Sequence, residues 1–142
     1  MSEGNNLILL GRPDQNAQTE KLMRSARVPV RFLGGGLEVG PSRFEGKDIG
    51  IVFLAPHWDE EQKSARLRFV VAGLGNEGMR NAMALAEPTI PPMMRAPFAN
   101  QVPDWIVVGR EVKGKGPGGI LAAGFFSPDW DVDPQTSYAA HV

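Results

Sequence analysis

The chain has 142 residues and a net charge of −1, with 42% hydrophobic and 22% charged residues, which fits a single domain. This nearly balanced charge gives no electrostatic reason to expect nucleic acid or an anionic membrane as partner, so neither is predicted. The absence of cysteine excludes disulfides, thiolate metal ligands and a cysteine nucleophile, and no segment approaches the ~20 apolar residues that membrane insertion requires.

The first apolar run is Leu7–Leu10, which we interpret as a buried strand. Glu3 precedes this run and no basic residue does, so the run is not typical of a signal peptide. The expected location is therefore cytoplasmic if the chain is complete, and this expectation lapses if the chain is part of a longer polypeptide.

A tight loop at residues 11–16 precedes the first expected helix. Either Asp14 or Asn16 is expected to cap this helix, because both side chains can accept hydrogen bonds from its first N–H groups. The helix should run to about Arg27, since Pro29 prevents its continuation. Next along the chain we expect a strand at residues 28–33 and a small hairpin formed by residues 37–39 and 43–44.

Two further apolar runs, residues 49–54 and 66–72, are predicted to be neighbouring strands, and Pro56 is expected to close the first of them. The polar, acidic stretch between them has only about eleven residues, which is near or below the dozen that a parallel crossover needs. We therefore expect the two strands to pair in antiparallel fashion.

The second of these strands leads into a helix, which favours an α/β fold. Residues 73–78 read Gly-Leu-Gly-Asn-Glu-Gly, and Asn76 is a plausible helix cap. Apolar residues then recur at helical spacing and form a stripe that would pack on a sheet, until Pro88 ends the pattern. This stripe consists of Met79, Ala82, Met83 and Ala86.

The last third begins with a proline-rich loop from Pro88 to Pro103, followed by strands at Trp105–Val108 and residues 120–126 that flank a glycine-rich turn. The fold class predicted from all these patterns is α/β, with a mixed central sheet flanked by helices in a three-layer arrangement and one or two hairpins. We expect a single α/β domain at residues 1–128 and a C-terminal arm or tail at 129–142.

Residues 73–78 also match the G-x-G-x-x-G dinucleotide-binding motif. Such a motif normally opens its domain and has an acidic residue about 20 positions later, whereas here strands precede it and a proline-rich loop follows. A turn that needs small residues is the favoured interpretation. The alternative is a small-ligand or nucleotide site, formed where loops 11–16 and 73–78 meet at strand ends. Its candidate residues are Gly11, Arg12, Asn16, Gly73, Gly75 and Asn76.

Catalytic and metal sites are not predicted, and no cofactor is expected. The acidic segment at residues 57–61 contains His57, but adjacent residues on an extended loop point apart and cannot converge on one ion. Asp129, Asp131 and Asp133 imitate an EF-hand, but Pro134 replaces the required glycine and Ala140 the required glutamate. The sequence also lacks the G-x-S-x-G motif of serine hydrolases.

Several short motifs occur in a characteristic order at residues 6–11, 28–30, 36–40, 44–46, 50–56, 69–73, 103–108 and 123–130. This order resembles the C-terminal α/β accessory module of secreted bacterial esterase or prolyl-peptidase-like hydrolases. Residues 72–73 and 77–82, an Ala-Gly turn followed by Glu-Gly and an Arg-Ala-rich helix, are similar to a segment of archaeal S-layer proteins. The resemblance implies a non-catalytic, extracellular α/β module within a longer parent chain.

The leading hypothesis for function is a structural or interaction module, accessory to a larger extracellular or hydrolase assembly. Protein partners or self-association are expected, because flexible thioethers and broad aromatic rings in loops suit an apolar docking surface. The residues predicted for this surface are Trp58, Met93, Met94 and Trp130.

Overall fold

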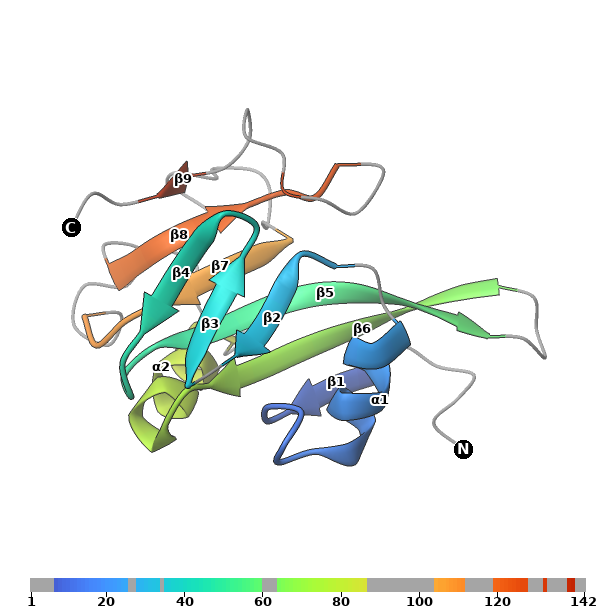
Figure 1. Cartoon of the computed structure of the whole chain (residues 1–142), viewed down its shortest axis with the longest axis horizontal. Coiled ribbons are helices and arrows are strands. Elements are labelled where there is room, and N and C mark those ends of the chain that lie inside the picture. The colour runs from blue at the N-terminus through green and yellow to red at the C-terminus, as the bar shows by residue number, and fades with distance from the viewer. Residues whose placement is uncertain are drawn as a thin grey trace.

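The computed structural model describes residues 7–25, 28–33, 35–59, 64–86, 104–111, 119–127, 132 and 138–139. These residues form two sheets and two helices (Figure 1). The elements are β1 (Leu7–Leu10), α1 (Ala17–Ser25), β2 (Val30–Leu33), β3 (Gly36–Val39), β4 (Ser42–Glu45), β5 (Gly50–Asp59), β6 (Ser64–Gly73), α2 (Asn76–Ala86), β7 (Trp105–Val108), β8 (Ile120–Gly124) and β9 (Tyr138–Ala139).

The larger sheet has six strands in the order β1-β6-β5-β7-β8-β9. Its centre is the antiparallel pair β5–β6, in which Gly50 lies opposite Gly73 and Asp59 lies opposite Ser64. This confirms the antiparallel pairing predicted from the short connection. Strand β1 pairs with β6 in parallel, whereas β7, β8 and β9 join in antiparallel fashion.

Strand β5 extends five residues beyond its predicted end at Leu54, to Asp59. The sequence suggested that Pro56 would close the strand, because proline lacks the N–H of the sheet ladder. The N–H of Leu54 donates to the carbonyl of Asp104 on the β7 side, so residue 56 also faces that side by the two-residue period of a strand. Strand β7 pairs only with Gly50–Phe53, and Pro56 therefore leaves no ladder bond unmade there.

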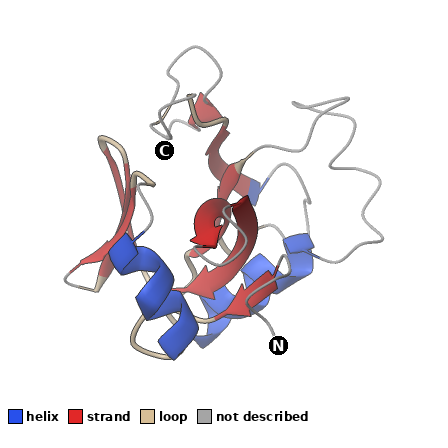
Figure 2. Cartoon of the chain, turned by 90° about the vertical axis from the view of Figure 1, so that its right-hand side faces the viewer, coloured by secondary structure: helices blue, strands red, loops and turns tan. Residues whose placement is uncertain are grey.

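The two faces of the six-stranded sheet bury different residues. One face packs against α1 and the three-stranded sheet β2-β3-β4, with Phe53, Val70 and Val107 at its centre. The other face packs against α2, with Val52, Val71 and Ala82 in contact. Figure 2 shows α1 and the small sheet on one side of the large sheet and α2 on the other.

The predicted α/β class is wrong, because the described part of the chain is mostly β, with two sheets and only two short helices, and is not a three-layer arrangement of helices around one sheet. The small sheet β2-β3-β4 supplies most of one covering layer, through inward-facing residues such as Val30, Leu37 and Val39. These segments were expected as a strand and a minor hairpin. Their alternation of buried and exposed residues identifies strands but does not say which sheet they join.

The strand-to-helix unit β6–α2 led to the wrong fold class. It is a real unit, and β7, which pairs antiparallel to β5, runs parallel to β6 with β5 between them. In the described chain β8 and β9 then join in antiparallel fashion without further helices, so the crossover is not repeated as an α/β fold requires. In the C-terminal segment, β9 pairs with β8, and the division into a domain and an arm stays a prediction.

Helix α2 begins in direct backbone contact with the segment that leads into β5. The Gly78 N–H donates to the Lys47 carbonyl at 2.8 Å, and the Leu74 N–H donates to the Ile49 carbonyl at 2.9 Å. The side-chain amide of the buried Asn81 donates to the Asp48 carbonyl at 2.9 Å. Three hydrogen bonds thus fix α2 to residues 47–49.

Glycine makes this contact possible. A Cβ atom on Gly78 would lie 2.0 Å from the Ile49 carbonyl oxygen, and one on Gly73 would lie 2.0 Å from the Met79 nitrogen. A Cβ on Gly50 would lie 2.2 Å from the Gly78 carbonyl oxygen. Since these neighbours are backbone atoms, the glycines of the G-x-G-x-x-G match serve close packing between helix and strand.

Replacing Gly78 by alanine tests this packing. In an uncrowded helix the Gly→Ala change stabilises by about 1 kcal/mol, but here the new methyl group must push α2 away from β5. We expect Gly78→Ala to lower the free energy of unfolding by about 2 kcal/mol or more, measured by urea denaturation. The control is Gly109→Ala, whose Cβ would meet nothing nearer than the Leu121 side chain at 3.3 Å and which should change stability little. A stabilised Gly78→Ala variant would contradict the packing.

Candidate functional site

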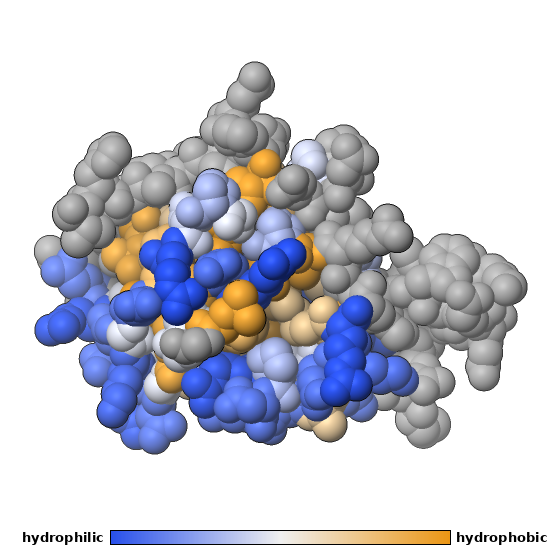
Figure 3. Space-filling view, in the orientation of Figure 1, coloured by the Kyte–Doolittle hydropathy of each residue, from blue (hydrophilic) through white to orange (hydrophobic). Residues whose placement is uncertain are grey.

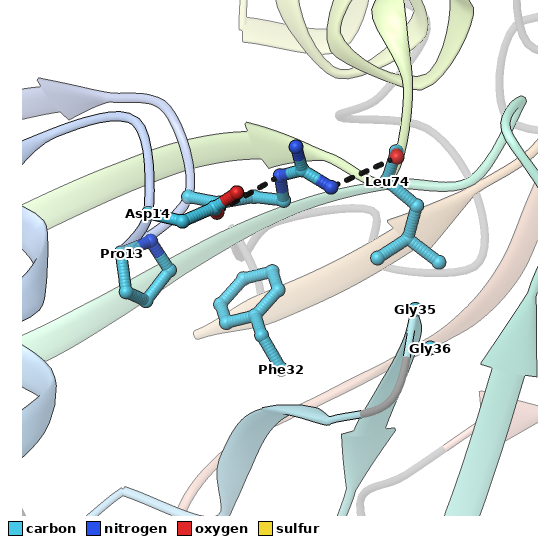
Figure 4. Close-up of a pocket in the computed structure, with 7 residues that line it drawn as sticks. Pro13, Asp14, Phe32, Gly35, Gly36 and Leu74 are labelled. Atoms are coloured by element: carbon cyan, nitrogen blue, oxygen red, sulfur yellow. Dashed lines mark hydrogen bonds and ion pairs between the residues drawn. The ribbon is translucent and has the colours of Figure 1, made fainter.

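The two strand-to-helix loops meet where strands β1 and β6 of the large sheet end. Strands β1 and β6 are parallel neighbours, so the loops that follow them, residues 11–16 and 74–75, leave the sheet at the same end. Arg12 joins the loops, because its Nη1 donates to the Leu74 carbonyl at 3.0 Å (Figure 4). The structure thus brings together the two loops that the sequence proposed as a site.

A pocket of about 230 Å³ lies beside this junction. The guanidinium Nε of Arg12 lies 3.3 Å from Oδ1 of Asp14, which is largely exposed. Figure 4 shows that the Phe32 ring lies near Pro13. It also shows that the Leu74 side chain lies above Gly35 and Gly36, where β3 begins. The lining residues are Arg12, Pro13, Asp14, Phe32, Gly35, Gly36 and Leu74.

Asn16 closes the first loop as the cap of α1, which confirms one of the two predicted caps. Its Oδ1 accepts from the N–H groups of Gln18 at 2.9 Å and Thr19 at 3.2 Å. Its Nδ2 donates to the Leu10 carbonyl at 2.9 Å. Gly11 starts the loop with a φ of 109°, a backbone conformation that favours glycine.

In the second loop, Gly73 and Gly75 lie against neighbouring segments, whereas the Asn76 side chain is exposed. The Gly78 N–H, which could hold an anion at a helix N-terminus, is bonded to Lys47. The N–H groups of Gln18 and Thr19 at the start of α1 are bonded to Asn16. A phosphate that used any of these three N–H groups would have to displace a protein acceptor, so the loop geometry favours capping and packing.

The remaining predicted residues are only partly described. The backbones of His57 and Trp58 belong to β5. Met93, Met94 and Trp130 lie outside the described residues. Within the described part of the chain, no group of three His, Asp or Glu side chains is placed to hold a metal ion. None of the described helices has the length and apolar character needed to span a bilayer.

An exposed apolar surface on β1 and β6 was missed by the sequence analysis. Ile8 is 68% exposed, Leu10 is 48% exposed and Leu67 is 40% exposed. Ile8 pairs with the half-buried Phe69, and Leu67 precedes Phe69 by two residues, so all four side chains share the sheet face that α2 partly covers. We call Ile8, Leu10, Leu67 and Phe69 the β1–β6 surface.

The sequence pattern that could have predicted the β1–β6 surface was ambiguous. The sequence Leu-Ile-Leu-Leu predicted a strand buried on both faces, and Leu9 is indeed buried against the core that includes α1. However, β1 is the terminal strand of its sheet, and α2 makes its main strand contacts with β6 and β5. The outward pair Ile8 and Leu10 is therefore left exposed, which a run of four apolar residues could not reveal.

The opposite side of the molecule is polar. Figure 3 shows hydrophilic residues gathered over the small sheet and α1, with apolar residues between them. On the small sheet, Arg43 Nη1 donates to Glu38 at 3.0 Å and Nε donates to Glu45 at 2.9 Å. The hydrogen bond with Glu45 is the main cause that raises the pKa of Arg43 above its usual value. Leu33 on this side is also exposed, at 49%.

Comparison with models of known protein families, with curated proteins and with solved structures gave no match.

The Asn16 cap can be tested by substitution. Asn16→Ala removes the acceptor for two helix N–H groups and the donor to Leu10, and we expect it to lower the free energy of unfolding by about 1–2 kcal/mol. Asn16→Asp keeps the acceptor and loses only the donor, so its loss should be smaller. Chemical denaturation measures both variants. Equal losses would mean that the cap contributes nothing beyond the Leu10 bond.

Proposed function

We propose that this chain is a non-catalytic interaction module that docks to a protein through the β1–β6 surface. The observation that carries this proposal is the exposure of three large aliphatic side chains, Ile8, Leu10 and Leu67, on one sheet face. Contiguous apolar side chains at the surface of a folded domain mark interaction sites more often than isolated ones do.

The free energy available from covering this surface is appreciable. Complete burial of an aliphatic side chain contributes roughly 1.5–3 kcal/mol. Ile8, Leu10 and Leu67 are 68%, 48% and 40% exposed, so a partner that covers them recovers roughly half of that for each, or about 2–4 kcal/mol in total. This free energy is sufficient to orient a partner, but additional contacts are needed to hold the partner in place.

An accessory role in a larger extracellular or hydrolase assembly is part of the same proposal. It rests on the resemblance of the motif order to hydrolase-associated and S-layer segments. The polar face over β2-β3-β4 and the apolar face on β1 and β6 give the module two chemically different sides, which suits a domain that attaches in one orientation.

Small-ligand binding at the Arg12 pocket is the second candidate. The hydrogen bond from Arg12 to Leu74 and the adjoining pocket support it. The bonded N–H groups of Gln18, Thr19 and Gly78 weigh against it, because protein acceptors already use these donors at the helix starts. A thermal-shift titration with nucleotides distinguishes the candidates. A saturable rise in melting temperature that Arg12→Met abolishes would favour ligand binding.

Site-specific photo-crosslinking tests docking. A photoreactive phenylalanine analogue at Leu67 should give protein adducts in the cells that produce this chain, because Leu67 lies on the β1–β6 surface. The same analogue at Leu33, which is similarly exposed on the polar side, serves as the matched control and should give none.

The adducts at Leu67 should also disappear when Ile8→Asp is added, since a carboxylate makes covering of the surface unfavourable. Circular dichroism shows whether this variant folds. Equal adduct formation at Leu67 and Leu33, or adducts at Leu67 that survive Ile8→Asp, would contradict docking through this surface.

A further inference from the structure

Arg12 carries a hydrogen-bond donor that its described neighbours leave unsatisfied. Its Nε is buried, and none of the acceptors in the described part of the chain forms a hydrogen bond with it. Oδ1 of Asp14 lies 3.3 Å from this Nε and makes a charge contact without hydrogen-bond geometry. Nη1 donates to the Leu74 carbonyl at 3.0 Å, which holds the guanidinium in place. Because a buried donor without an acceptor is unfavourable, this position suits a ligand oxygen.

Asp14 is only a weak competitor for this donor. Its side chain is 69% exposed, whereas the side chain of Arg12 is 24% exposed. Exposed ion pairs contribute little to stability, so the Asp14 carboxylate turns into solvent at little cost. A carboxylate matches the planar fork of a guanidinium and accepts two parallel N–H bonds from it. An incoming carboxylate therefore has a place beside Arg12 once Asp14 turns away.

The other walls of the pocket are apolar and are held by the core. Phe32 and Leu74 are partly buried and pack against the core under the small sheet, and Pro13 lies near the Phe32 ring (Figure 4). Of the described residues that line the pocket, only Arg12 and Asp14 are charged. The volume of about 230 Å³ lies below the roughly 300 Å³ at which ordinary ligand pockets begin. The ligand must therefore be small, with one charged end and an apolar body.

We propose that the Arg12 pocket binds a small organic acid. The carboxylate of the acid takes the place of Asp14 on the Arg12 guanidinium, and its apolar body lies between Phe32 and Leu74. This inference rests on the second candidate function and names its ligand class, and it does not depend on docking through the β1–β6 surface. The hydrogen bond from Arg12 to Leu74 orients the guanidinium before the ligand arrives, which lowers the entropic cost of binding.

An NMR titration of the full chain with benzoate tests this binding. Benzoate should shift the Arg12 Nε–H signal and the Phe32 amide signal until they saturate. Benzamide has the same ring and a similar shape but no charge, so it should shift neither signal. Asp14→Asn removes the competing carboxylate and should tighten benzoate binding by at least about threefold. Arg12→Met removes the cation and should abolish binding.

Arg24 provides the matched control, because it pairs with Glu20 at an exposed site on α1 and does not line the pocket. Arg24→Met should leave the affinity for benzoate unchanged. Equal binding of benzoate and benzamide, or an Asp14→Asn variant that binds benzoate no more tightly, would overturn the proposal. If benzoate fails but nucleotides raise the melting temperature through Arg12, the pocket remains a ligand site and only the acid is wrong. If neither binds, the ligand-binding candidate fails as well, while the adducts at Leu67 test docking separately.

Discussion

Ten successive residue pairs join β5 to β6, from Gly50 opposite Gly73 to Asp59 opposite Ser64, and every layer of the fold is built on this ladder. Its odd-numbered β5 residues, such as Ile51 and Phe53, enter the core that lies under the small sheet. Val52 and Val71 enter the core under α2. One antiparallel pair therefore fixes both cores, and the other elements add to its edges or its faces.

The attachment of α2 to this ladder determines what the glycine-rich turn can do. Gly78 and Leu74 donate to carbonyls at Lys47 and Ile49, and the absence of a Cβ on Gly78 permits the approach. The turn is used for packing, just as Asn16 uses the other loop for capping. The polar groups of these two loops thus bond largely within the protein, whereas the face of β1 and β6 leaves large apolar side chains exposed.

Local signals in the sequence predicted local features well. The short connection predicted the antiparallel β5–β6 pair, and the side chains of Asp14 and Asn16 predicted a helix cap, which Asn16 forms. Features that depend on distant neighbours were not accessible. Nothing in residues 30–45 says that these strands form a separate layer, because an alternating strand fits the face of any sheet. Nor does Leu-Ile-Leu-Leu reveal that β1 is an edge strand. Pro56 was wrongly expected to end its strand, because the sequence does not show that the neighbouring strand β7 stops before reaching it.

Amide hydrogen exchange at Gly78 and Leu74 tests most directly whether α2 is fixed by backbone contact to the start of the ladder. Amides in the first turn of a helix ordinarily lack intrahelical partners and exchange quickly. Here both amides should be protected to the same degree as those of Val52 and Val71, and should exchange only when the β5–β6 pair opens. If they exchange as fast as free amides while Val52 and Val71 stay protected, α2 is not held in this way and the account fails.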